Sequence, residues 1–213
     1  MRLVTVAHGT RLPAGNEVAR AITADAAARL GVPGVAAFVE LASPLLVSVL
    51  ESDEPSVVVP LLLSTGYHVR EDLAVVAGRA LGPDPLLAAA QVSRLLAAGA
   101  SPGAPAVMVA AGSRDPLATR DLRQAAGLLA EAWGAPVRLA TLGGLGRRPC
   151  DVVRPGDVVS PYLLAPGFFA TRCRDESLAA GASVLADVIG PHPRVVDLVV
   201  ARATELLAAR RSA

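Results

Sequence analysis

The sequence contains no lysine, few aromatic residues and two isolated cysteines, and each shortage excludes a class of protein. All 20 basic residues are arginine, and they nearly balance 19 acidic residues for a formal net charge of +1. This balance argues against the strongly basic surface of a nucleic-acid-binding protein. Cys150 and Cys173 lie outside any CxxC spacing, so we expect neither a disulfide framework nor a zinc ribbon.

Long apolar runs are also missing. The longest weakly charged stretch, 31–50, is interrupted by Pro33, Glu40 and Pro44, which does not fit a membrane span. The N-terminus shows no basic region, apolar stretch and cleavage site in series, as a secretory leader would. We therefore expect a soluble cytoplasmic protein without a membrane or nucleic-acid partner. With 53% hydrophobic and only 3% aromatic residues, its core must be built from Ala, Val and Leu.

The sequence repeats itself with an offset of about 103 residues. Residues 7–11 (AHGTR) match 110–114 (AAGSR), and four further pairs of segments match in the same order. These are 37–40 with 140–143, 59–63 with 160–164, 66–68 with 167–169, and 82–85 with 190–193. The repeat predicts an N-terminal lobe over 1–103 and a degenerate C-terminal copy over 104–213, with the Gly- and Pro-rich segment 98–105 as the linker.

Each half alternates short apolar runs, typical of buried strands, with longer stretches that have helical periodicity. The predicted strands are 2–7, 34–40, 56–63, 106–110, 136–142 and 157–164, and the predicted helices are 16–30, 70–81, 86–98, 116–133, 172–188 and 194–210. This alternation predicts an α/β fold of two similar lobes, each a small, mostly parallel sheet flanked by helices. We expect the active site in the cleft between the lobes.

Three predicted strands of the first half end in a side chain able to bind a metal. His8 follows the first strand, Glu40 ends the second, and His68 lies shortly after the third. Because parallel strands bring their carboxyl ends to one edge of a sheet, these side chains are predicted to converge there. Imidazole and carboxylate together suit Fe²⁺, Co²⁺, Ni²⁺ or Zn²⁺. Taken singly, each histidine also fits a hydrogen-bonded turn and Glu40 a salt bridge to an arginine.

The three motifs together resemble those of the class II sirohydrochlorin chelatases, the cobalt- and iron-inserting enzymes of the cobalamin and sirohaem pathways. The motifs are AHGTR at 7–11, AFVE at 37–40 followed by Pro44, and VVPLLLSTGYHVRED at 58–72, of which the last is the most specific. The resemblance covers the N-terminal half motif by motif. It extends to the second half as the degenerate copy found in the long, duplicated members.

The resemblance implies that His8, Glu40 and His68 bind the metal and that His8 is also the catalytic proton acceptor. The second repeat has Ala111, Gly143 and Phe169 at the matching positions, so one active site per chain is expected. Arginine binds carboxylates well, and sirohydrochlorin carries many of them. The predicted substrate contacts are Arg11, Ser43, Ser64, Thr65, Gly66, Tyr67 and Arg114.

The expected reaction is insertion of Co²⁺ or Fe²⁺ into sirohydrochlorin, with Ni²⁺ as a third candidate metal and no permanently bound cofactor. Histidine suits this task because it both binds metals and accepts protons near neutral pH. The expected partners are the tetrapyrrole and a divalent metal, and the expected state is a monomer, with a dimer as the alternative.

Two other functions fit parts of the same pattern. A carrier of metal or tetrapyrrole would use the same ligands without catalysis. A histidine phosphatase would use a histidine followed by glycine as phosphate acceptor, but here Ala7 stands where such enzymes have an arginine.

Overall fold

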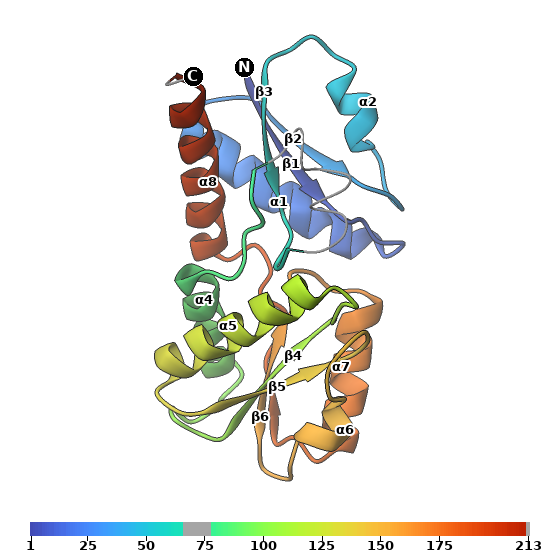
Figure 1. Ribbon diagram of the computed structural model, residues 1–213, viewed down its shortest axis with the longest axis vertical. Helices are drawn as coiled ribbons and strands as arrows, with labels where there is room; N and C mark the ends of the chain where they lie inside the picture. Colours follow the sequence, from blue (N-terminus) through green and yellow to red (C-terminus); the bar gives the residue numbers. More distant parts are fainter. Residues whose placement is uncertain (66–77, 212–213) are drawn as a thin grey trace. The chain divides into compact units, whose positions relative to one another are not determined.

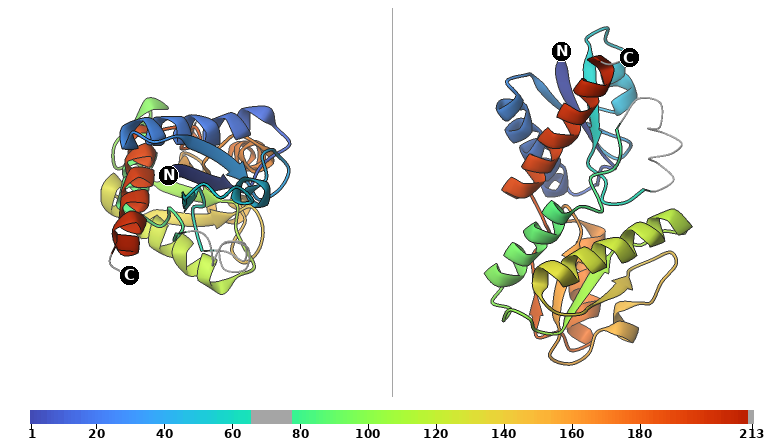
Figure 2. Two further views of the ribbon diagram at one scale, coloured as in Figure 1. Left: turned by 90° about the horizontal axis from the view of Figure 1, so that it is seen from above. Right: turned by 60° about the vertical axis from the view of Figure 1, so that its left-hand side comes forward.

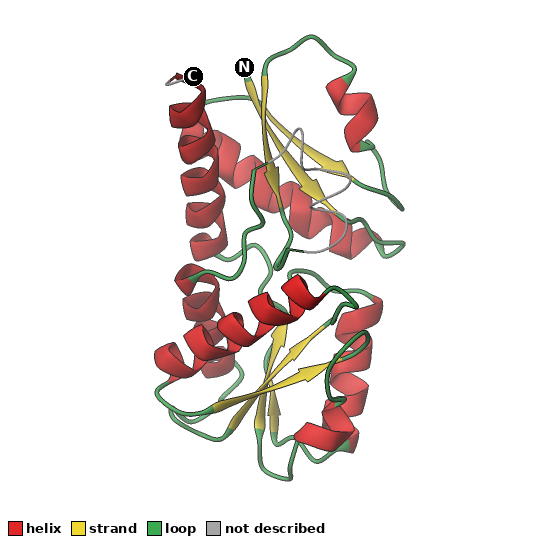
Figure 3. Ribbon diagram, in the orientation of Figure 1, coloured by secondary structure: helices red, strands yellow, loops and turns green. Residues whose placement is uncertain are grey.

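The computed structural model describes residues 1–65 and 78–211. The chain forms two compact units, each described below by itself. Unit 1 comprises Met1–Leu81 together with Pro191–Ala213, and unit 2 comprises Gly82–Gly190. Each is a small parallel sheet flanked by helices (Figure 3), which confirms the predicted fold class.

Unit 1 contains a parallel sheet in the order β2-β1-β3. Valine-rich β1 lies in the centre, and its side chains alternate between the two faces of the sheet. On one face, Val4 and Val6 pack against Leu46 and Val49 of a short helix, α2. Helices α1 and α8 pack on each other and on the sheet (Figure 1). The elements are β1 Arg2–Ala7, α1 Pro13–Leu30, β2 Gly34–Phe38, α2 Leu46–Leu50, β3 Ser56–Pro60 and α8 Pro193–Arg211.

Unit 2 repeats this plan with one more strand, in the order β5-β4-β6-β7. Its central strand β4 is buried along its whole length. The long helix α5 begins after Asp115, whose side chain accepts a hydrogen bond from the Leu117 N–H, and it ends at Gly134, as predicted. The elements are α4 Pro85–Ala97, β4 Ala106–Ala110, α5 Pro116–Trp133, β5 Val137–Thr141, α6 Pro149–Val152, β6 Val158–Tyr162, α7 Phe168–Ala179 and β7 Val184–Leu185.

The strand registers repeat together with the sequence. Ala7 is paired with Phe38 at the end of β1, and Ala110 is paired with Thr141 at the end of β4. Both members of the second pair lie 103 positions after those of the first. The internal duplication predicted from the sequence therefore extends to individual backbone pairs.

The closing helix of each repeat belongs to the compact unit formed mainly by the other repeat. Helix α4 closes the first repeat but packs on α5 and β6, whereas α8 closes the second repeat but packs on α1 and β3 (Figure 2). The compact units therefore divide the chain after Leu81 and Gly190, while the repeats divide it near residue 103. Segment 98–105, predicted as a linker between lobes, instead joins α4 to β4 inside unit 2, where Ala104 O accepts a hydrogen bond from Trp133 Nε1.

Two predicted helices differ from the structure. The helix predicted over 172–188 begins earlier, at Phe168, and ends at Ala179, and residues 184–185 form β7 at the edge of the sheet. This strand exists because it pairs with β6, a contact that local periodicity does not reveal. Of the helix predicted over 70–81, residues 78–81 are not helical and the rest lies outside the described residues. Among the described helices, none combines the length and apolarity that a membrane crossing requires.

Candidate functional site

The carboxyl ends of β1 and β2 bring two of the predicted metal ligands together. Beyond the last paired residues, Ala7 and Phe38, the backbone bonding continues for two more residues. The Val39 N–H donates to Ala7 O, and the Glu40 N–H donates to His8 O at 3.0 Å. His8 and Glu40 therefore leave adjacent strands side by side.

Their side chains meet above this junction. His8 Nε2 lies 3.1 Å from Glu40 Oε1, and the two side chains are 46% and 55% exposed. An imidazole nitrogen and a carboxylate oxygen at this separation, accessible to solvent, offer one nitrogen and one oxygen donor to an incoming ion. The ligand roles of these residues stay predictions.

A glycine allows the two loops to approach so closely. Gly9 has φ +95°, and a Cβ atom there would lie 1.9 Å from Glu40 O. The second repeat has the same arrangement, because Gly112 has φ +85° and its Cβ would lie 2.0 Å from Gly143 O. The retained glycine thus preserves the loop junction in a repeat that lacks the ligands.

The remaining predicted site residues lie in several places. Arg11 and Ser43 are exposed on the loops that follow β1 and β2, and Ser64 and Thr65 are half-buried in the segment after β3. Gly66, Tyr67 and His68 lie outside the described residues. Within 1–65 and 78–211, no three His, Cys, Asp or Glu side chains are grouped closely enough to hold a metal ion. The described part of unit 1 therefore contains two of the three predicted ligands in contact.

Helix α1 contributes two side chains that the sequence analysis missed. Asn16 hydrogen-bonds to the backbone of Thr10, and Arg20 donates to the Ser43 carbonyl. The signal available in the sequence was an asparagine in the first turn of a predicted helix, next to a glycine turn. Asparagine and aspartate often bond to nearby loop backbone at such positions.

Unit 2 has no ligands at the corresponding strand ends. Ala111 and Gly143 are half-buried there, and Phe169 is exposed. Leu145 on the loop after β5 and Phe168 and Phe169 in the first turn of α7 are exposed apolar side chains. Arg114, the predicted substrate contact of this repeat, is exposed after β4.

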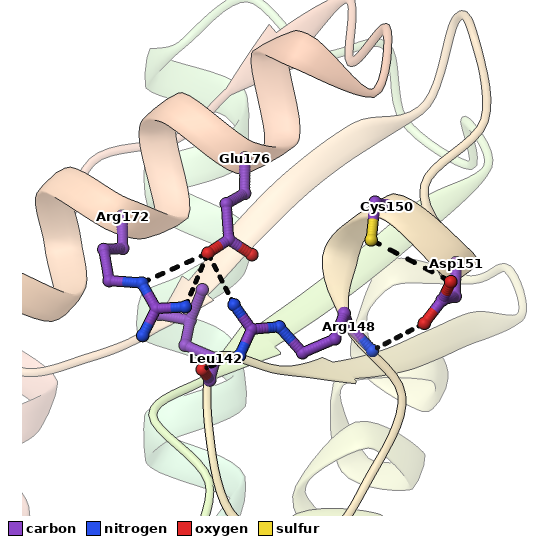
Figure 4. A network of polar contacts seen from close by, with 6 residues as sticks. All are labelled: Leu142, Arg148, Cys150, Asp151, Arg172 and Glu176. Atoms are coloured by element: carbon purple, nitrogen blue, oxygen red, sulfur yellow. Dashed lines mark hydrogen bonds and ion pairs between the residues drawn. The ribbon is translucent and has the colours of Figure 1, made fainter.

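A polar network also missed from the sequence joins the loop between β5 and α6 to α7 (Figure 4). Glu176 Oε1 accepts from Arg148 Nη2 at 2.7 Å and from Arg172 Nη2 at 2.7 Å. Arg148 also donates to Leu142 O and, through its backbone N–H, to Asp151. The Arg172 guanidinium lies 5.5 Å from the centre of the Phe168 ring. One carboxylate thus orders two cationic side chains beside an exposed aromatic ring.

Two ionisable groups of unit 2 are held neutral by their surroundings. Burial raises the pKa of Tyr162, and the negative charges of Asp121 and Asp84 raise it further. Burial also raises the pKa of the Cys173 thiol to about 11. Neither group therefore supplies a nucleophile at neutral pH.

Comparison with known proteins agrees with the motifs and the geometry. The CbiX family model matches residues 2–98 and again 105–206, once for each repeat. No curated protein matches the chain.

Solved structures resemble the whole chain. SirB from Bacillus subtilis with Fe³⁺ has a TM-score of 0.80 at 25% identity, over 99% of this chain and 97% of that chain. CbiX, described as the terminal enzyme of siroheme biosynthesis in denitrifying bacteria, has a TM-score of 0.62 at 17% identity, over 98% and 99% of the two chains.

A larger protein shares the same fold. DR2241 from Deinococcus radiodurans, a multi-domain protein with structural similarity to chelatases, has a TM-score of 0.72 at 18% identity. The match covers 96% of this chain but 55% of that one. Since the family model covers nearly all of the chain, this protein belongs to the CbiX family, the class II sirohydrochlorin chelatases that its motifs resemble, in the long form with an internal duplication.

Proposed function

We propose that this protein inserts Co²⁺ or Fe²⁺ into sirohydrochlorin at the carboxyl edge of the unit 1 sheet. The observation that carries the proposal is the contact between His8 and Glu40, 3.1 Å apart on adjacent strand ends, in a chain matched twice by the CbiX family model. SirB, a relative by fold, was solved with Fe³⁺, which supports iron as one of the two candidate metals.

His8, Glu40 and His68 would hold the metal before transfer. A site with nitrogen and oxygen donors binds such ions less tightly than thiolates would, which suits a metal that must leave. The exposure of His8 and Glu40 leaves room for the ion to reach the macrocycle. Arg11 and Ser43 are exposed. Ser64 and Thr65 are half-buried, so all four side chains are accessible for contact with the substrate.

Insertion exchanges one divalent cation for two pyrrole N–H protons, so charge is balanced when both protons leave. His8 is proposed to accept one of these protons once the departing ion has freed its nitrogen, and the second proton would pass to solvent. Exposed Leu12 and Leu41 lie on the same loops as His8 and Glu40 and offer apolar surface for the macrocycle face. The placement of the site in a cleft between the lobes, and the contact from Arg114, stay predictions.

The test is turnover of metal-free sirohydrochlorin by the purified full chain, with Co²⁺, Fe²⁺ and Ni²⁺ in separate and in competing reactions. Metal insertion is followed by the absorbance change of the macrocycle. We expect turnover with Co²⁺ or Fe²⁺, and a loss of at least about 100-fold in His8→Ala. His192→Ala is the matched control, because His192 lies at the start of α8, where its Nδ1 accepts from the Arg194 N–H.

Two outcomes would contradict the proposal. Normal turnover in His8→Ala would exclude the proton-acceptor role. Binding of metal and tetrapyrrole without conversion would identify a carrier, the function that uses the same ligands without catalysis.

A further inference from the structure

The loops that carry His8 and Glu40 are both attached to one helix, α1. Asn16, in its first turn, is 8% exposed. Its Oδ1 accepts from the Thr10 N–H at 3.0 Å, and its Nδ2 donates to Thr10 O at 2.8 Å. One amide side chain therefore satisfies both backbone groups of the residue two positions after His8, which fixes that loop in one conformation.

One helical turn later, Arg20 holds the other loop. Its Nη2 donates to Ser43 O at 3.2 Å, and its guanidinium lies 5.5 Å from the ring centre of Phe38, the last residue of β2. Glu17 orients the guanidinium by accepting from Nη1 at 2.6 Å. Arg20 thus contacts the start and the end of the segment that contains Glu40.

Asn16 and Arg20 share one face of α1, since residues four apart in a helix lie next to each other. We call the contacts of Asn16 with Thr10 and of Arg20 with Ser43 the two clamps. Because both start from one helix, the distance between them is set by a rigid element. The loops themselves contact each other directly, through the Glu40 N–H to His8 O bond and the close approach at Gly9. Helix and loops together leave little freedom in the distance between His8 and Glu40.

The second repeat, which has no ligands, does not use its helix in this way at the position of Asn16. Thr119 stands there, and its Oγ1 donates to Asp115 O within its own helix. Both repeats hold the turn after the first strand with a hydroxyl, since Ser113 Oγ accepts from the Asp115 N–H as Thr10 Oγ1 accepts from the Leu12 N–H, so the Asn16 contact is an addition in the first repeat. The clamp at Asn16 is therefore present in the repeat that carries the predicted ligands and absent from the repeat that keeps only the fold.

We infer that Asn16 and Arg20 are positioning residues that hold His8 and Glu40 at the separation needed to bind the divalent metal. The inference rests on the proposed ligand roles of His8 and Glu40. Neither Asn16 nor Arg20 touches the ion. They act through the backbone of the ligand loops, and changes to such supporting contacts weaken metal affinity by about 10–100-fold in other metal sites.

The experiment measures Co²⁺ binding by titration calorimetry on the full chain. Asn16→Ala and Arg20→Met are each expected to weaken binding by about 10-fold, and the double variant to weaken it more than either alone. Arg20→Lys restores one donor to Ser43 O and should recover part of the loss. Asn16→Asp keeps the acceptor for the Thr10 N–H and serves as the milder variant if Asn16→Ala does not fold.

Two matched controls lie on the same helix but away from the loops. Thr23→Val removes a buried hydrogen bond to Thr5 in the middle of β1, and Arg29→Met removes the ion pair with Asp197 of α8. Both are expected to lower the melting temperature while Co²⁺ affinity stays within about twofold of the wild type. If Asn16 and Arg20 have a purely structural role, their variants should also lower the melting temperature and leave Co²⁺ affinity unchanged.

The reference variants His8→Ala and Glu40→Ala separate two kinds of failure. If they lose Co²⁺ affinity while Asn16→Ala and Arg20→Met bind as the wild type does, the positioning role is wrong and the ligand assignment stands. If His8→Ala and Glu40→Ala bind Co²⁺ normally, the proposed function itself is wrong. Equal affinity losses in the clamps and in the controls would also overturn the positioning role.

Discussion

At the scale of single residues, the contact between the two reactive side chains depends on a glycine that takes no part in the reaction. His8 and Glu40 are the reactive groups, but their contact requires a position without a side chain at Gly9. The same requirement persists at Gly112, where no ligand is present. Substitutions at Gly9 and Gly112 can therefore be compared to separate an effect on stability from an effect on metal binding.

Gly9→Ala is expected to lower the free energy of unfolding by roughly 2–3 kcal/mol, because alanine is strained at positive φ and its Cβ would overlap Glu40 O. Gly112→Ala should cost a similar amount for the same reason. Metal affinity should fall only in Gly9→Ala, since only that loop carries ligands. Urea denaturation followed by circular dichroism, together with Co²⁺ titration, measures both quantities. Equal Co²⁺ affinity in the two variants would contradict this prediction.

The two cysteines are expected to differ in reactivity. Cys173 is buried and its pKa is raised to about 11, so its thiol stays protonated and inaccessible at pH values below that. Cys150 is exposed at the start of α6. Iodoacetamide should therefore add one group per folded chain, located at Cys150 by peptide mass spectrometry, and two after unfolding. Labelling of Cys173 in the folded protein would show that unit 2 opens locally.

At the scale of elements, side chains that join loops to helices decide the details of each unit. In unit 1 these are the clamps from α1. In unit 2, Glu176 of α7 binds Arg148 and Arg172 and thereby ties the end of β5 to α7 (Figure 4). In both units, hydrogen bonds from helix side chains thus fix the positions of loops at the strand ends.

Glu176→Gln is expected to destabilise unit 2 by about 1 kcal/mol, because two guanidiniums lose their shared carboxylate at a partly exposed site. The loss should be larger at low salt than at high salt, since salt screens the repulsion between the remaining charges. Urea denaturation at both salt levels, followed by Trp133 fluorescence, measures it within unit 2. Glu131→Gln, an exposed change on α5, serves as the control. An effect that does not depend on salt would show that the network is not held by charge.

At the scale of the whole molecule, the duplication and the compact units divide the chain differently. Each repeat gives its closing helix to the unit formed mainly by the other. Helix α8 supplies buried residues to unit 1, namely Val195, Val196, Leu198, Val199 and Ala203. The repeat boundary is therefore a poor place to cut the protein.

Removal of residues 104–213 is expected to abolish activity and to prevent residues 1–103 from folding as a soluble monomer, because α1 and β3 lose their contact with α8. By contrast, residues 1–81 joined by a flexible linker to 191–213 keep the complete unit 1 and should fold. Size-exclusion chromatography and circular dichroism compare the two fragments. We also expect one catalytic metal per full chain. A folded monomer of 1–103, or two equivalent metals per chain, would contradict this view.

The sequence alone determined the features that depend on local pattern. Strand positions follow from short apolar runs, the ends of two long helices from Gly31 and Gly134, and the family from motifs around His8, Glu40 and His68. The duplication is visible because the two repeats still share turn residues such as Gly9 and Gly112. These signals lie within a few neighbouring positions, so no knowledge of the folded chain is needed to find them.

Only the tertiary structure decided which unit each closing helix joins, why 184–185 is a strand, and how Asn16 and Arg20 hold the ligand loops. An apolar helix face is compatible with more than one partner, and two residues form a strand only when a neighbouring strand offers its backbone groups. In the same way, an asparagine or arginine on a helix is an ordinary surface residue until a loop distant in sequence presents a carbonyl oxygen to it. Each of these outcomes depends on contacts between distant segments, which the sequence encodes only through the complete fold.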